Sequence, residues 1–406
     1  MASFKEHFEI PGRYKKWSMG LMAVGVLSLI VGFALYGTHG EGTRFWSALL
    51  QNSVYFLLIV NAAMFFFAAT TLAWGGFQMA FRRVTEAIAA SVIPIGTITF
   101  VILMCIVFGG KATIYQWLDK SVVAKDEVLL GKSGFLSVGF FTVYTILTIG
   151  LWIVLGWKLR ALSRSIDSTP LNVEQGRKFM FKTTIWAAVY IVWFGLTVAS
   201  VTPWLWLMSL DAHWFSTMYS WYTFASTFVS GIALITLFVI FLKNQGYLEL
   251  VNEEHLHDLG KFQFAFSIFW TYLWFDQFML IWYANISEET VYFKTRFVGA
   301  YQGIFYLNLV INFLAPLLIF MSRGAKRNWT TVTFMSVLLV FGHWLDLYQM
   351  VFGSTSKDHV PMNLFDFGIA LGFVGLIMWQ TGRVLAKFPL LERNHPLLKE
   401  SIIHHT

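Results

Sequence analysis

Long apolar runs separated by short polar connectors fill this chain from one end to the other. An α-helix rises about 1.5 Å per residue, so roughly 20 apolar residues are needed to cross the hydrocarbon core of a bilayer. About ten runs reach that length, at residues 17–37, 47–73, 87–108, 135–157, 181–202, 218–242, 262–284, 298–320, 330–352 and 363–385. We therefore predict an all-α, polytopic membrane protein, a single membrane domain over residues 1–406.

The composition agrees with this pattern. Of the 406 residues, 57% are hydrophobic and 13% are charged, which leaves too little polar surface to coat a soluble globule. The net charge of +7 would suggest nucleic acid if the protein were soluble. Here the basic residues lie between the apolar runs, where they set topology, so we expect no nucleic-acid partner.

The basic residues also predict an orientation. If the N-terminus is placed inside, the inner connectors carry 21 of the 29 Lys and Arg residues and the outer connectors carry 8. Because cytoplasmic connectors are enriched in Lys and Arg, we expect both termini to be cytoplasmic. Arg13, Lys15 and Lys16 precede the first run, which is too long for a typical signal peptide and lacks a clear cleavage site. We interpret it as a retained anchor.

Two residue types limit the cofactors that the chain can bind. Cys105 is the single cysteine, which excludes an intramolecular disulfide, iron–sulfur ligation and covalent attachment of haem c. His343 is the only histidine within the ten predicted spans. Haem b or copper at membrane depth needs at least a pair of imidazoles, so we predict no metal-ligated or covalently bound cofactor.

Ionisable groups at membrane depth are the candidate chemistry. Insertion of a charged residue into the middle of a span costs about 2.5 to 3.5 kcal/mol on insertion scales, so its presence indicates a structural or functional role. On the predicted topology these groups collect toward the outer half of the membrane. The proton-handling candidates are Asp276, His343, Asp346, Asp211, His213 and Asp366.

Each candidate has two readings. His343 and Asp346 are three residues apart, which puts them on one helix face, where they could relay protons or only fix helix packing. Asp276 has no basic residue within one turn, so it either handles protons or meets another helix through a hydrogen bond. Asp211 and Asp366 lie near the interface, where a solvated loop position or a helix cap is the more ordinary role.

Two further features bear on function. Arg82, Arg83 and Glu86 open the third span, where a basic inner boundary with one paired acid is the ordinary reading and proton uptake the alternative. Pro94 and Pro316 fall inside spans and predict kinks. Broken helices are typical of secondary transporters, but we find no Gly- or Pro-interrupted pair at matching positions of two halves.

Four segments resemble a known family of membrane subunits. They are MSLDAHWFSTMY at 208–219, GKF at 260–262 leading to Phe269 and Trp270, FDQFMLIWYANI at 275–286, and GHWLD at 342–346. They are similar to NrfD/PsrC-like quinone-interacting subunits, and most to the ActF-type subunits of bacterial alternative complex III. The resemblance extends over nearly the whole chain.

The resemblance implies two four-helix bundles, at 47–202 and 218–352, with flanking helices, in a bacterial inner membrane. It implies a subunit of a quinol:electron-acceptor oxidoreductase without a redox centre of its own. The expected partners are haem c and iron–sulfur subunits, a second NrfD-like subunit that is linked to quinol oxidation, and a terminal oxidase. Menaquinone or another quinone is the expected cofactor of the complex, and proton translocation its accompanying function.

A quinol site needs a proton acceptor and an apolar slot for the ring. His343, Asp346 and Asp276, together with the aromatic region 214–224 that contains Trp214, Tyr219 and Tyr222, could supply one. The sequence does not assign these aromatic residues to a pocket. A secondary transporter and a purely structural membrane scaffold stay open as alternative functions.

Overall fold

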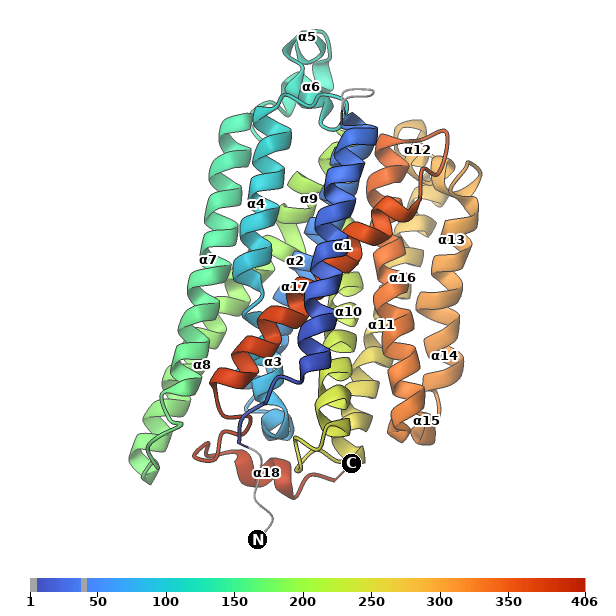
Figure 1. Ribbon diagram of the computed structural model, residues 1–406. Coiled ribbons are helices and arrows are strands. Elements are labelled where there is room, and N and C mark those ends of the chain that lie inside the picture. Colours follow the sequence, from blue (N-terminus) through green and yellow to red (C-terminus); the bar gives the residue numbers. More distant parts are fainter. Residues whose placement is uncertain (1–5, 38–41, 406) are drawn as a thin grey trace.

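Helices make up nearly all of the structure, a computed structural model that describes residues 6–37 and 42–405 (Figure 1). The described ranges contain no strand. The helices are α1 (Gly12–Tyr36), α2 (Thr43–Leu72), α3 (Arg82–Ala89), α4 (Val92–Phe108), α5 (Lys120–Val123), α6 (Glu127–Gly131), α7 (Val138–Arg164), α8 (Val173–Leu196), α9 (Thr202–Trp206), α10 (Met218–Asn244), α11 (Glu253–Ala284), α12 (Ser287–Phe297), α13 (Gln302–Leu309), α14 (Ala315–Phe320), α15 (Arg323–Arg327), α16 (Trp329–Thr355), α17 (Leu364–Lys387) and α18 (Leu398–Ile402).

Within the described residues, 10 helical segments are long and apolar enough to cross a membrane. This confirms the prediction of a polytopic all-α membrane protein. The helices extend beyond the apolar runs where polar caps allow it. The helix α11 begins at Glu253, because the Asn252 side chain accepts hydrogen bonds from the backbone N–H groups of Glu254 at 3.0 Å and His255 at 3.2 Å. The apolar run predicts which part of α11 lies in the membrane, whereas the Asn252 cap determines where the helix begins.

Two neighbouring sets of helices pack around α2. On one side α2 contacts α3, α4 and α8, and α7 packs against α4 and α8. On the other side α2 contacts α10 and α16, and α10 packs against α11 and α16. The first set comes from the predicted 47–202 range and the second from the predicted 218–352 range. The long helices run side by side between two ends of the molecule (Figure 1).

The flanking helices α1 and α17 pack along one another through glycines. A Cβ atom built on Gly25 would lie 2.4 Å from the Cα of Gly372, so neither position has room for a side chain. Such small residues let membrane helices approach closely. Many apolar side chains on the other sides of α1 are exposed, with Leu27 and Ile30 each 62% exposed, as expected for a surface that faces lipid.

Two spans contain a wider turn next to a proline. Residues Thr197–Val201 (η4) and Val310–Leu314 (η6) form π-helical turns, followed by Pro203 and Pro316. A proline has no N–H to donate, so the backbone around it departs from the regular helical pattern. The turn beside Pro316 lies where the sequence predicts a kink. The two turns fall in the fifth and the eighth spans, so they do not occupy the same place in the two sets.

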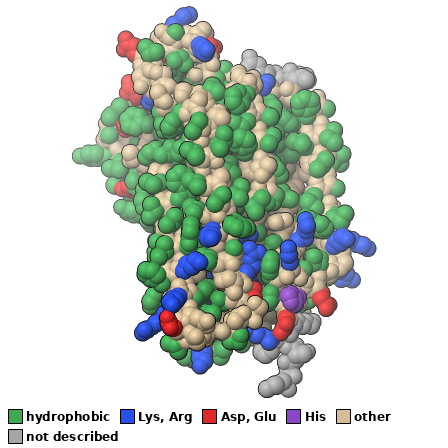
Figure 2. All heavy atoms as spheres, turned by 90° about the vertical axis from the view of Figure 1, so that its left-hand side faces the viewer, with side chains coloured by type: hydrophobic (Ala, Val, Ile, Leu, Met, Phe, Trp, Pro, Cys, Tyr) green, Lys and Arg blue, Asp and Glu red, His purple; other side chains and the backbone are tan. Residues whose placement is uncertain are grey.

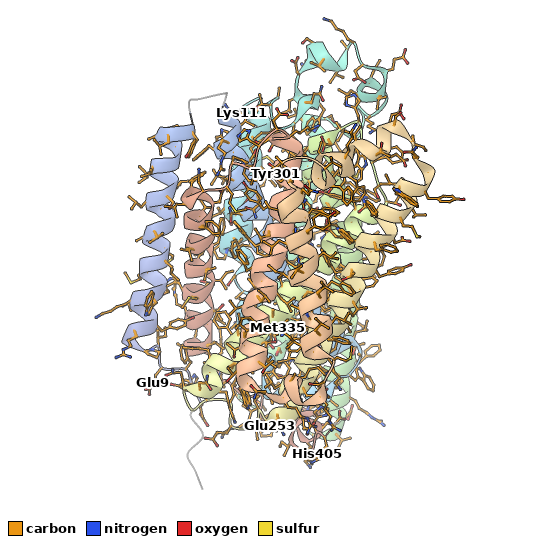
Figure 3. The ribbon with its side chains drawn as sticks, turned by 90° about the vertical axis from the view of Figure 1, so that its right-hand side faces the viewer. Glu9, Lys111, Glu253, Tyr301, Met335 and His405 are labelled. Carbon is orange, nitrogen blue, oxygen red and sulfur yellow. The ribbon has the colours of Figure 1, made fainter. Side chains whose placement is uncertain are left out.

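The two ends of the molecule differ in charge. We call the end that carries both termini the terminal end and the opposite one the α5–α6 end. Figure 3 places Glu9, Glu253 and His405 toward the terminal end, and Lys111 and Tyr301 toward the α5–α6 end. On the face in Figure 2, apolar side chains cover the middle, and Lys and Arg gather mainly toward the terminal end.

Candidate proton-handling site

Asp346 lies at the centre of a buried hydrogen-bonded cluster formed by three helices. On α16 it is 2% exposed. Its carboxylate accepts hydrogen bonds from the Ser226 hydroxyl of α10 at 2.9 Å, the Trp270 indole N–H of α11 at 3.0 Å, and the Tyr222 hydroxyl of α10. Asp346 is four residues beyond the middle of α16, about 6 Å toward the α5–α6 end. Asp346, which the sequence places in the outer half of the membrane, therefore accepts hydrogen bonds from three donors. We call Tyr222, Ser226, Trp270, His343 and Asp346 the central cluster.

His343 joins this cluster one turn earlier on α16. Its Nδ1 lies 3.1 Å from Ser226 Oγ, and its ring packs edge-on against Trp270 with centroids 5.4 Å apart. The Ser226 hydroxyl has one hydrogen, which it donates to Asp346, so the contact with His343 requires Nδ1–H of the imidazole as donor. The neutral ring then presents Nε2 as an acceptor. Nε2 has no partner among the described residues, which leaves it able to receive a proton.

A small cavity adjoins the carboxylate of Asp346. Its volume is about 20 Å³, and it is lined by Tyr222, Trp274, Gln277, Tyr292, Phe293, Arg296, Phe305, Asp346, Gln349 and Met350. A water molecule needs roughly 10–15 Å³ and two to four polar partners. The amides of Gln277 and Gln349 each have a nitrogen without a partner among the described residues, and buried polar atoms of this kind usually pair with water. The cavity therefore fits one water beside Asp346.

Arg296 closes the cavity on the side of the α5–α6 end. Its guanidinium donates to the backbone oxygens of Tyr292 at 2.8 Å and Met350 at 3.3 Å and to Ser354 Oγ at 3.0 Å. A Cβ on Gly353 would lie 3.0 Å from the Arg296 guanidinium carbon, so the glycine allows this cation to lie against α16. Arg296 is 3% exposed. A buried positive charge and a carboxylate thus face the same small space.

Polar side chains continue from the central cluster along the facing sides of α10, α11 and α16. They recur every three or four residues or a multiple of that, which is the spacing that keeps them on one helix face. All are buried. We call this set the polar seam: Tyr222, Ser226 and Ser230 on α10, Gln263, Ser267, Trp270 and Gln277 on α11, and Ser336, His343, Asp346 and Gln349 on α16.

The sequence argument missed most of the seam, although its signal was present. The proton-handling candidates were acids and histidines only, whereas the donors to Asp346 are two hydroxyls and an indole, of which the sequence analysis named Tyr222 alone. Ser226 is four residues after Tyr222, and Gln263, Ser267 and Trp270 follow one another at intervals of four and three. A search for neutral polar residues at helical spacing in apolar runs would have found them.

Trp214 and Tyr219 lie beside the cluster in an aromatic stack. The rings of Trp214 and Tyr292 are stacked with centroids 4.0 Å apart, and Tyr219 meets Trp214 edge-on at 5.7 Å. The Trp214 indole N–H donates to the backbone oxygen of Glu289 at 3.1 Å. Of the three aromatic residues that the sequence analysis names in region 214–224 without assigning them to a pocket, Tyr222 contacts Asp346 directly and the other two pack with Tyr292.

Asp276 is not part of the central cluster. It is half-buried on α11, beside Phe275, which is 53% exposed, and it does not line the cavity. Trp270 and Gln277 are seven residues apart and so share a face, whereas Asp276 is rotated from that face by about 100°. No hydrogen bond or ion pair joins its carboxylate to another described residue. Its proposed role as a proton carrier stays a prediction.

The remaining predicted residues form ion pairs toward the α5–α6 end. Asp366 is fully buried, and both of its oxygens accept from Arg44, at 2.9 and 2.5 Å. Asp366 also accepts the backbone N–H of Asn363 at 3.0 Å, so it caps α17 as the ordinary reading expects. Outside the spans, Asp211 pairs with Lys357 at 2.9 Å, and His213 pairs with Asp126 at 2.5 Å.

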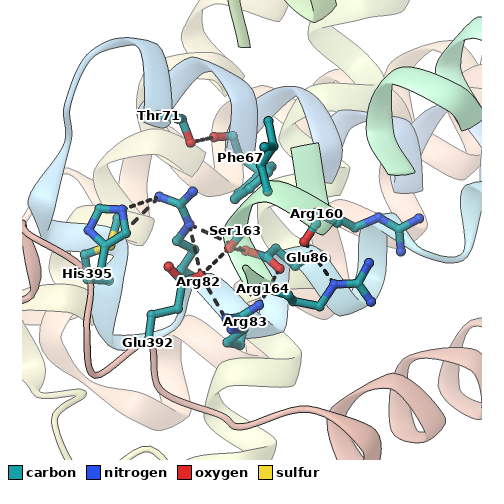
Figure 4. A network of polar contacts seen from close by, with 12 residues as sticks. Phe67, Thr71, Arg82, Arg83, Glu86, Arg160, Ser163, Arg164, Glu392 and His395 are labelled. Atoms are coloured by element: carbon teal, nitrogen blue, oxygen red, sulfur yellow. Dashed lines mark hydrogen bonds and ion pairs between the residues drawn. The ribbon is translucent and has the colours of Figure 1, made fainter. Parts of the chain in front are cut away.

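A second buried polar network lies toward the terminal end (Figure 4). We call Arg82, Arg83, Glu86, Ser163, Asp167 and Glu392 the arginine–glutamate network. Arg82 lies 3.3 Å from Glu392 and 3.5 Å from Glu86, while Arg83 pairs with Glu86 at 2.9 Å and with Glu392 at 3.4 Å. Arg83 also pairs with Asp167. The sequence predicted one paired acid at this boundary, and the fold brings two more from distant parts of the chain.

Glu392 is held ionised by this network. Burial by itself would raise the pKa of Glu392, but the charges of Arg82 and Arg83 outweigh burial and hold it below its usual value. The pKa of the neighbouring His395 is also lowered, to about 4, by burial and then by the charge of Arg82. His395 is therefore neutral at physiological pH. In agreement, its Nδ1 accepts the backbone N–H of Leu397 at 3.2 Å.

No protein-family model matches the sequence, and a search of curated proteins found no match. Within the described residues there is also no group of three or more His, Cys, Asp or Glu side chains that could hold a metal ion. The resemblance to NrfD/PsrC-like subunits thus stays a prediction that rests on the four sequence segments.

Proposed function

We propose that this multi-pass membrane protein is a non-haem subunit of a quinol-oxidising respiratory complex of the alternative complex III type. In this proposal its own contribution is proton handling by Asp346 and His343. The observation that carries the proposal is the environment of Asp346. It is a buried carboxylate inside a span, with three hydrogen-bond donors, a histidine one turn away and room for one water. Ionisable residues inside membrane spans are costly to bury and commonly mark functional sites, so a carboxylate with these partners is a candidate functional residue.

The chemistry of quinol oxidation explains the need for such a group. Oxidation of one quinol to a quinone releases two electrons and two protons. The electrons pass to haem c and iron–sulfur groups in partner subunits, and the quinone ring is bound by the second NrfD-like subunit. The protons need acceptors whose charged and neutral forms are both tolerated. The cavity beside Asp346 has space for a water, while ring-sized ligands occupy sites of roughly 300 Å³ or more, which favours proton transfer over ring binding at this position.

The polar seam supplies polar groups on both sides of Asp346 for the transfer. From Asp346 the next polar groups toward the α5–α6 end are Gln349 and Arg296, which line the same cavity. Toward the terminal end, His343 is followed by Ser336, which accepts from the Gln263 amide at 3.0 Å. In this proposal water bridges the seam between these groups, and protons leave past Arg296.

Purification tests the assignment to a complex. The full chain is tagged, extracted from its native membrane in mild detergent, and analysed for subunits and for the absorbance of haem. Co-purification of haem c and iron–sulfur proteins with quinol oxidation activity is expected. A colourless chain that purifies alone and mediates solute uptake in liposomes would refute the proposal and support the secondary transporter.

Substitution of Asp346 tests the proton-handling role. Asp346→Asn keeps the size of the side chain and removes the charge, and we expect quinol oxidation or proton release by the assembled complex to fall at least about tenfold. Asn61→Ala is the control, because Asn61 is equally buried and accepts the Tyr190 hydroxyl at 2.5 Å in the other set of helices. We expect its activity to stay within twofold.

Two outcomes of this experiment would count against the role of Asp346. Equal activity and an equal proton-to-electron ratio in the Asp346→Asn complex would contradict the role of Asp346. A matching loss in the Asn61→Ala complex would show that any lost buried hydrogen bond has this effect, and would favour the structural scaffold. A separate Asp276→Asn complex decides whether that half-buried carboxylate takes part, because only a proton carrier would lose activity without losing subunits.

A further inference from the structure

Two arginines at the end of α7 lack the carboxylate partners that their neighbours have. Arg160 and Arg164 are one turn apart on the same face, and each uses its Nε–H to bond a backbone oxygen, Gly156 at 3.2 Å and Arg160 at 2.9 Å. Arg160 is 8% exposed. No described carboxylate lies within ion-pair distance of either guanidinium. In Figure 4 both guanidinium groups point to the same side, away from Glu392 and His395.

The charges around these arginines do not balance. Arg82, Arg83, Arg160 and Arg164 supply four positive charges, while Glu86, Asp167 and Glu392 supply three negative ones, which leaves an excess of one positive charge. All three carboxylates are already paired with Arg82 or Arg83. His395 adds no charge. Arg160 is buried and Arg164 is half-buried, and a partner of opposite sign stabilises a buried charge, so the excess favours the binding of a further anion.

The space beside the two arginines is a small cleft of about 10 Å³ with one cationic and one apolar wall, so a phosphate would bind at the mouth of the cleft and not inside it. It lies between α3, α7 and the end of α17, and is lined by Arg83, Glu86, Arg160, Arg164, Val384, Leu385, Phe388 and Pro389. The guanidinium of Arg164 lies 4.4 Å from the centre of the Phe388 ring. A planar guanidinium offers two parallel N–H donors to a phosphate, which makes paired arginines a suitable phosphate site.

Apolar surface adjoins the cleft on the membrane side. Trp157, about one turn before Arg160 and two turns before Arg164 on α7, is 54% exposed. A tryptophan near the end of a span is typical of the boundary between the hydrocarbon core and the lipid headgroups. The site therefore offers a cationic surface to a headgroup and an apolar surface to acyl chains. This continuity favours a phospholipid over a free phosphate ion.

We propose that Arg160 and Arg164 bind the phosphate of an anionic phospholipid at the terminal end of the molecule. A phosphodiester carries one negative charge, which cancels the excess of the surrounding residues. A headgroup with an added quaternary ammonium would place a positive charge beside the arginines, so an anionic lipid such as phosphatidylglycerol binds more tightly than phosphatidylcholine. This site does not depend on the proposed respiratory function.

Native mass spectrometry of the full chain tests the site. The delipidated protein in detergent is titrated with phosphatidylglycerol, phosphatidylcholine and inorganic phosphate in separate experiments. The test variant is Arg160→Gln with Arg164→Gln. The matched control is Arg177→Gln with Lys178→Gln, which removes the same charge from exposed positions at the start of α8.

We expect the test variant to bind phosphatidylglycerol at least tenfold more weakly and the control to stay within twofold. Equal weakening of both variants would show general electrostatic attraction and overturn the proposal. Equal binding of the two lipids by the unaltered chain, or displacement of lipid by millimolar phosphate, would also overturn it. If the double variant aggregates, Arg164→Gln alone, at a half-buried position, is expected to weaken binding threefold or more, and an unchanged affinity would refute the site.

Discussion

Removing the charge of Glu392 should release the C-terminal segment, residues 388–402, from the terminal end of the molecule. Glu392 reaches Arg82 at 3.3 Å, Arg83 at 3.4 Å and Ser163 Oγ at 2.6 Å, and is 1% exposed. These three residues belong to α3 and α7. Glu392 is therefore a main link between this segment and the membrane helices.

The magnitude follows from what Glu392→Gln leaves behind. Breaking a buried ion pair by removal of one partner costs about 3 to 5 kcal/mol. Arg83 keeps Glu86 and Asp167, and Arg82 keeps Glu86 at 3.5 Å, so the lower limit of about 3 kcal/mol applies. Since every 1.4 kcal/mol is a factor of ten, local opening should become about 100-fold more frequent.

Hydrogen–deuterium exchange measures this opening directly. Several backbone amides of the segment are hydrogen-bonded, among them Leu390 to the oxygen of Glu6 at 2.8 Å and Glu400 to that of Leu397 at 3.1 Å. Their exchange should accelerate about 100-fold in Glu392→Gln. The control is Glu174→Gln, because Glu174 pairs with Lys178 on the surface, where both side chains are 76% exposed, and such pairs contribute about 0–1 kcal/mol. Exchange in Glu392→Gln within threefold of the unaltered chain would refute the reasoning.

Two further predictions concern stability. The pKa of His395 is lowered to about 4 by burial and by Arg82, so the segment loses stability as the pH falls from about 6.5 toward 4, by about 2 kcal/mol at pH 5. Hydrogen–deuterium exchange in residues 388–402, corrected for its intrinsic pH dependence, should therefore rise about 30-fold from pH 7.5 to pH 5. A similar rise in His395→Gln would show that His395 is not the cause. Gly372→Ala should lower thermal stability by about 1–3 kcal/mol through overpacking, because its Cβ would lie 2.7 Å from the Cα of Gly25 on α1. The control is Gly20→Ala, also on α1, where a Cβ would have no atom within 4 Å. Equal melting temperatures of the two variants would contradict the close approach.

The ten spans could be predicted because the requirement behind them is local. A bilayer demands a minimum length of apolar helix, and every backbone N–H and C=O in that helix is satisfied within the segment itself. The helix ends were less certain, since a cap such as Asn252 depends on a single side chain. His343 and Asp346 were also accessible from sequence, because a spacing of three residues on one helix fixes their relative placement whatever surrounds them.

The sequence does not predict which residues of other helices contact His343 and Asp346. Ser226 and Trp270 meet Asp346 from α10 and α11, and Glu392 meets Arg82 across about 310 residues of chain. Contacts of this kind depend on how helices pack and on how each helix is rotated about its axis. No local pattern determines that rotation when all sides of a helix are largely apolar.

Asp276 and Asp346 show this division most clearly. Both are aspartates within apolar runs, and the sequence by itself determines that each lies in a transmembrane helix. Only the tertiary structure decides that Asp346 faces three donors while Asp276, one residue before the buried Gln277, lies on the half-exposed side of α11. The physical reason is that one residue along a helix is a rotation of about 100°, enough to move a side chain from the interior to the surface.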